Sequence, residues 1–148
     1  MRKVAVLGIA LLFWAVAASA LAGGPLALKD TTWVGALTFV HPNDGSTVTD
    51  NATLTFTAED GEFLAGTLAC KTAPTVPCQV LPDPLTPISF SCIRMGNVLE
   101  MTAVGYSMSA VIFKGHPVKK GNRHPQQMLI QGSNFQDGDM FRGTLTKQ

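Results

Sequence analysis

DGEFLAGTL (residues 60–68) and DGDMFRGTL (residues 137–145) repeat one pattern within a chain of 148 residues. In each copy an Asp-Gly pair precedes an acidic residue and a short stretch that ends in Gly-Thr-Leu. Asp-Gly before alternating apolar residues indicates a hairpin turn that leads into a strand. One face of the first strand would carry Leu64, Gly66 and Leu68, and the equivalent face of the second would carry Phe141, Gly143 and Leu145. Glycine inside a strand is typical of a sharp bend in a barrel wall or of a close backbone approach.

The same period of two extends outward from this repeat through the rest of the chain. Runs rich in Thr, Val, Phe and Ile predict strands at residues 32–40, 53–57, 63–69, 88–93, 98–104, 107–113, 128–133 and 140–146. Turn-forming residues separate several of them, at residues 42–45, 59–61, 95–97 and 136–138. Short strands at this spacing indicate an all-β sandwich or barrel. With the two glycine bends, we expect a single antiparallel, up-and-down β-barrel of eight strands.

Residues 1–22 have the features of a secretory signal peptide, with a helix-forming apolar segment ahead of the barrel domain. Arg2 and Lys3 give a positive start, residues 4–18 are almost wholly apolar, and Ala20 and Ala22 fit a small-residue cleavage site. We expect cleavage after Ala22, with Ala20 as the alternative site. An uncleaved membrane anchor is the other interpretation, but about 15 to 19 apolar residues is short for a spanning helix. The sequence thus predicts a single domain over residues 23–148, secreted or periplasmic.

Loss of the signal peptide changes the charge of the protein. The whole chain has 11 basic and 10 acidic residues, and removal of Arg2 and Lys3 leaves 9 basic residues and a formal charge of −1. A nearly neutral domain argues against a general nucleic-acid binder, which is normally strongly basic. The remaining length suits one domain with its own core.

Trp33-Val34-Gly35, followed by the 60–68 hairpin, resembles the small eight-stranded calycin barrels, the avidin and lipocalin-like class. The resemblance covers mainly residues 32–69 and the C-terminal hairpin, and it implies an exported binding barrel. Biotin binders of this class use several pocket tryptophans, whereas the predicted mature chain has only Trp33, so biotin binding does not follow. If the barrel holds a small apolar ligand, the candidate ligand-binding residues are Trp33 and Tyr106, the only tyrosine.

Three cysteines follow the signal peptide, in a compartment that permits disulfides. Cys70 and Cys78 bracket a Pro-containing loop, and Cys92 shares the strand face of Ile88 and Phe90. We expect a Cys70–Cys78 bridge with Cys92 as a buried thiol, and the two other pairings stay open. Metal-binding spacings such as CxxC are absent from the sequence and its histidines are scattered, so we predict no metal site and no cofactor.

Motifs of catalysis are also missing from the sequence, which has no GxSxG elbow and no phosphate-binding glycine loop. The carboxylates Asp60, Glu62, Asp137 and Asp139 fall at hairpin turns, where we interpret them as turn-forming and solubilising residues. The sequence therefore favours a noncatalytic protein over an enzyme.

Residues 114–125 are the most distinctive polar stretch of the chain. They contain no acid, and the candidate partner-binding residues among them are Lys114, His116, Lys119, Lys120, Arg123 and His124. Such a segment could bind an anionic partner, such as a phosphate-rich envelope surface or the acidic cleft of a protein, or it could be a solubilising loop.

The leading hypothesis is a secreted or periplasmic noncatalytic binding protein, which holds a small apolar ligand or, like an enzyme inhibitor, presents loops to a macromolecule. An eight-stranded outer-membrane barrel is the first alternative, although its aromatic girdles are missing from the sequence. A barrel enzyme acting on a small hydrophobic substrate is the second.

Overall fold

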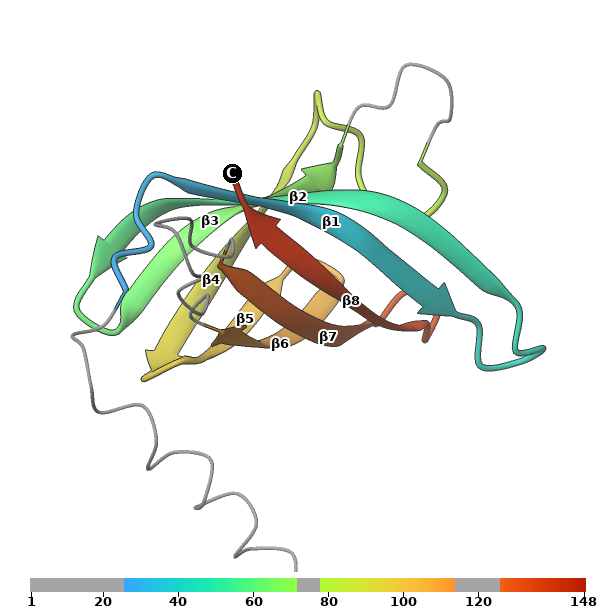
Figure 1. Cartoon of the computed structure of the whole chain (residues 1–148). Coiled ribbons are helices and arrows are strands. Elements are labelled where there is room, and N and C mark those ends of the chain that lie inside the picture. Colours follow the sequence, from blue (N-terminus) through green and yellow to red (C-terminus); the bar gives the residue numbers. More distant parts are fainter. Residues whose placement is uncertain (1–25, 72–77, 114–125) are drawn as a thin grey trace, which may run out of the picture.

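The protein folds into one closed β-barrel of eight strands, paired in the order of the sequence. The computed structural model describes residues 26–71, 78–113 and 126–148. Every strand is antiparallel to its neighbours, and β8 closes the barrel against β1 (Figure 1). The strands are β1 (Thr31–Val40), β2 (Thr47–Asp60), β3 (Phe63–Cys70), β4 (Ile88–Met95), β5 (Val98–Ala103), β6 (Tyr106–Phe113), β7 (Gln127–Asn134) and β8 (Met140–Lys147). The predicted up-and-down barrel is confirmed, and the described residues contain no helix long and apolar enough to cross a membrane.

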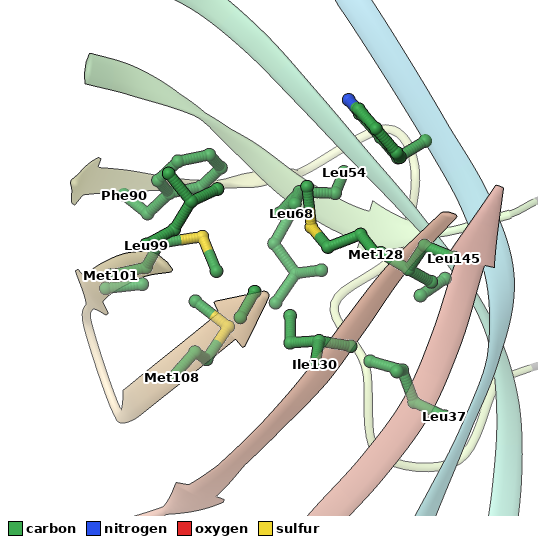
Figure 2. Close-up of a cluster of buried hydrophobic side chains, with 14 of the residues drawn as sticks. Leu37, Leu54, Leu68, Phe90, Leu99, Met101, Met108, Met128, Ile130 and Leu145 are labelled. Atoms are coloured by element: carbon green, nitrogen blue, oxygen red, sulfur yellow. The ribbon is translucent and has the colours of Figure 1, made fainter. Parts of the chain in front are cut away.

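The core fills the inside of the barrel. Successive side chains on a strand point to opposite faces, so one apolar set from each strand turns inward. In Figure 2, Leu37, Leu54, Leu68, Phe90, Leu99, Met108, Met128 and Leu145 come from the eight strands toward one interior, and each is at most 2% exposed. The outward positions between them are mostly threonine, serine and charged residues.

The two copies of the repeated pattern form equivalent structures. Each is a turn that leads into a strand, β3 in the first copy and β8 in the second. Gly61 and Gly138 in these turns have φ values of 61° and 75°, a left-handed conformation that favours glycine. Gly66 and Gly143 lie where backbones approach closely, because a Cβ on either would come within 2.1 Å of a carbonyl oxygen on the next strand.

The prediction for the second strand was wrong in length. We expected residues 53–57, but β2 runs over Thr47–Asp60 and pairs with β1 along ten residues. Its added N-terminal part still alternates, since Thr47, Thr49 and Asn51 are exposed whereas Asp50 and Ala52 are buried. A bulge near Thr57 then shifts the register opposite β3. The first residues of β2 were missed because the inward position at residue 50 is an aspartate, where the alternating pattern requires an apolar residue.

Candidate functional site

Residues 26–30, which precede β1, cover one end of the barrel, which we call the N-terminal end. Leu28 is fully buried there. The inward-facing Arg94 of β4 donates from Nη1 to the carbonyl oxygen of Leu26 and to Oε1 of Glu59, at 2.6 and 3.1 Å. The other carboxylate oxygen of Glu59 accepts the backbone N–H groups of Leu28 and Lys29. An ion pair between two strands thus fixes the chain segment that closes this end.

The environment of Glu59 favours its charged form. Burial raises the pKa of this carboxyl, but the hydrogen bonds from Lys29 and Leu28 and the charge of Arg94 outweigh that effect. The net pKa of Glu59 lies below its ordinary value. Arg94 is itself only 5% exposed, and its Nη2 has no hydrogen-bond partner within the described residues. A buried guanidinium of this kind depends on Glu59 for its charge balance.

The opposite end, which we call the disulfide end, is covered by residues 78–81, in the described part of the connection from β3 to β4. Asp50, 4% exposed, accepts hydrogen bonds from the backbone N–H groups of Gln79, Val80 and Leu81. Tyr106 donates from its hydroxyl to the carbonyl oxygen of Val80 at 3.0 Å. Leu81 is 5% exposed and belongs to the core. A buried carboxylate therefore organises the segment that covers the disulfide end.

The structure separates the two predicted ligand-binding residues. Trp33 lies near the N-terminal end, fully buried, and donates from Nε1 to the hydroxyl of Thr31 at 3.0 Å. Tyr106 lies at the disulfide end and is 7% exposed. The donor group of each side chain is used within the protein. A ligand at Trp33 and Tyr106 stays a prediction.

Cys70 and Cys78 lie at disulfide distance, with a Cα–Cα separation of 6.2 Å, as the sequence predicted. The bridge joins the end of β3 to the segment that Asp50 holds. Cys92 is a buried free thiol, also as predicted. Burial, partly offset by the charge of Arg94, raises the pKa of Cys92 to about 11. A thiol with so little thiolate at neutral pH is a poor nucleophile.

His41 and Asp139 form the one histidine–carboxylate contact between described residues, with 2.5 Å between Nδ1 and Oδ1. The sequence interpretation of Asp139 as a solvated turn residue was wrong, because its side chain is 1% exposed. It shares the inward direction of Phe141, two residues further along. The contact joins the β1–β2 turn to the β7–β8 turn. No serine, threonine or cysteine is hydrogen-bonded to this pair among the described residues, so the pair lacks the nucleophile of a catalytic triad.

The outer wall of the barrel has a groove and several exposed apolar side chains. A groove of about 620 Å³ crosses β5 to β8 and reaches β1, with Gly132 on its lining and Glu100 and Arg142 among its side chains. Beside it, large apolar side chains face outward, and those at least 48% exposed on β3 to β7 are Phe63, Ile93, Met95, Phe113 and Leu129. Contiguous exposed apolar surface is typical of interaction sites.

Sequence reasoning missed the inward polar residues Asp50 and Arg94. The signal was present in the alternation, since Asp50 shares the face of Leu54, and Arg94 that of Phe90. Their partners could not be found in this way, because Glu59 and residues 79–81 come from other parts of the barrel.

The predicted basic segment, with Lys114, His116, Lys119, Lys120, Arg123 and His124, lies outside the described residues, as does the predicted signal peptide. Comparison with known proteins adds no family, because neither a protein-family model nor a curated protein matches the sequence.

Proposed function

We propose that the protein is an exported, noncatalytic binding protein that engages a macromolecular partner through the outside of its barrel. The observation that carries this proposal is the packed interior. Inward side chains from all eight strands belong to one buried cluster, to which Leu28 at one end and Leu81 at the other also belong. A ligand-binding barrel instead needs an open interior cavity.

The polarity of the wall favours this function over an outer-membrane barrel. A barrel that spans lipid carries apolar residues outside and polar residues inside. Here the inward positions are mostly apolar, with Asp50 and Arg94 as polar exceptions near the two ends. Exposed outward positions include Asn51, Ser89, Ser91, Glu100 and Thr102. Such a wall suits contact with water and with polar partners.

Two features support export. The cysteine pair at disulfide distance fits an oxidising compartment. Among the described residues, the contacts that close the N-terminal end begin at Leu26 and Leu28, so cleavage after Ala22 would leave these residues in place. The mature protein would thus keep its complete barrel.

For the partner, the sequence favours an anionic surface. Residues 114–125 combine four Lys and Arg residues with two histidines and no acid. In the sequence they lie between β6 and β7, and a connection between the strands of a rigid barrel is a usual place for binding residues.

The test is a pull-down from the native envelope or secreted fraction with the full mature protein. We expect K119E/K120E/R123E to lose a partner that the wild type retains, while its circular dichroism spectrum stays unchanged, because exposed charges contribute little to stability. Binding should also weaken between 0.1 and 1 M salt, since the Debye length falls from about 10 Å to about 3 Å.

K29E/K71E/K147E is the matched control, because it changes the net charge equally at positions outside residues 114–125: before β1, after β3 and at the end of β8. The control should keep the partner. Identical partner sets for wild type and K119E/K120E/R123E would overturn the basic segment as the binding surface.

A further inference from the structure

An apolar row crosses the outer wall near the N-terminal end. It consists of four outward residues in direct register on β4 to β7: Met95, Val98, Val111 and Leu129. Met95 is 57% exposed and Leu129 is 48% exposed. Phe113, 53% exposed, lies two residues beyond Val111 on β6 and so faces the same way. Together these side chains form a continuous apolar strip across four strands, in which Val98 and Val111 are half-buried.

A second row, parallel to the first, has charges at its two ends. In register on β5 to β8 it contains Glu100, Ser109, Gln131 and Arg142, and we call it the charged row. The acid and the base are three strand spacings apart, about 14 Å at 4.7–4.9 Å per spacing. Neither Glu100 nor Arg142 makes a salt bridge with another described residue. The order along the row is acid, polar, polar, base.

This order is self-complementary under a two-fold rotation. An axis that lies between two facing copies and runs parallel to the strands, between β6 and β7, places β5 of one copy opposite β8 of the other. Glu100 then faces Arg142 of the second copy, and Arg142 faces its Glu100. On the apolar row the same axis places Val111 opposite Leu129, twice. An isologous dimer requires one surface that matches itself in this way.

We propose that two copies of the chain associate through the β6–β7 face of the barrel wall, with Val111 and Leu129 of the two apolar rows in contact and Glu100 paired with Arg142 across the axis. The convex wall brings β6 and β7 closest to the second copy and leaves β5 and β8 further away. Long side chains are needed to bridge that wider gap, and glutamate and arginine stand at those two positions. The groove beside the apolar row is lined by Ser107, Ser109 and Ser133, which would keep water in the interface.

This assembly does not depend on the proposed partner, because it uses neither residues 114–125 nor an anionic surface. Its measurement is the molar mass of the mature protein by sedimentation equilibrium over a concentration series. We expect a monomer–dimer equilibrium. E100R and R142E should each weaken the dimer about tenfold, which corresponds to about 1.4 kcal/mol, because each places like charges together.

The double variant E100R/R142E exchanges the two charges and should restore dimerisation to near the wild-type level. E62R is the matched control, since Glu62 is exposed but lies off both rows, and it should leave the equilibrium unchanged. L129S should weaken the dimer through the apolar row. A wild-type protein that stays monomeric at millimolar concentration would overturn the proposal, and so would a dimer that the charge exchange fails to restore.

Discussion

Glu59 and Arg94 form the ion pair that holds the N-terminal segment over the barrel. The carboxylate of Glu59 also accepts two backbone N–H groups, so the charged form has three hydrogen-bond partners in the folded state. The unfolded chain offers none of them. A carboxyl of this kind links the stability of the protein to pH.

The sign of this linkage follows from the lowered pKa of Glu59. The contribution to stability is fully present above the ordinary carboxyl pKa, near 4.3, and is lost as the pH falls through the lower pKa of the folded state. We expect Glu59→Gln to reduce the free energy of unfolding at pH 7 by about 1–3 kcal/mol, because the buried guanidinium of Arg94 would then face a neutral amide and lose its charged partner.

Urea denaturation of both proteins at pH 7, 5, 4 and 3 measures this difference, which should shrink toward pH 3. Asp60→Asn is the control, since Asp60 is the exposed next residue on the strand. A difference that stays constant over the pH range would show that the charge of Glu59 is not what stabilises the segment.

At the scale of elements, the backbone of a neighbouring strand lies close to Gly66 of β3 and to Gly143 of β8. This close approach explains why both copies of the repeated pattern have glycine before Thr-Leu. A Cβ at residue 66 would lie 2.1 Å from the carbonyl oxygen of Thr55 and 2.5 Å from the Phe90 ring. One at residue 143 would lie 2.1 Å from the carbonyl oxygen of Ala36. Backbone cannot move aside as a flexible side chain can, so the strands would have to separate locally.

Gly66→Val and Gly143→Val should therefore each destabilise the protein by about 2–3 kcal/mol, the upper range for overpacking. Thermal or urea unfolding measures this effect. Ala36→Val is the control, because Ala36 is exposed on the outer wall, and it should change stability by less than about 0.5 kcal/mol. Unchanged stability in both glycine variants would mean that the barrel wall adjusts easily at these two positions.

Seven of the eight strands were predicted to within a few residues because each has a period of two, and most of them also adjoin a turn signal. The start of β2 failed the same test, since Asp50 stands where the pattern requires an apolar residue. Its burial depends on the N–H groups of residues 79–81, almost thirty residues away. Local patterns contain no information about such a distant partner.

At the scale of the whole molecule, the closure of the barrel decides what the protein can bind. The sequence predicted the barrel, and it allowed an apolar ligand in the interior at Trp33 and Tyr106. The described structure fills that interior and uses the donor groups of both residues for its own hydrogen bonds. Neither the two closing segments nor the self-complementary rows could be predicted, because both depend on the register between strands.

The N-terminal end gives the last prediction, which connects export with folding. Leu28 is fully buried and lies a few residues after the predicted cleavage site, so the mature protein should begin at Gly23 and still contain the whole closing segment. N-terminal sequencing of exported material tests the first part, and an intact Met1 would contradict it. For the second part, Leu28→Ala should destabilise the mature barrel by about 2–4 kcal/mol, as expected for a leucine removed from a packed core. Leu85→Ala is the matched control, since Leu85 is 89% exposed, and it should unfold like the wild type. If both variants unfold like the wild type, the segment before β1 is not part of the cooperative core.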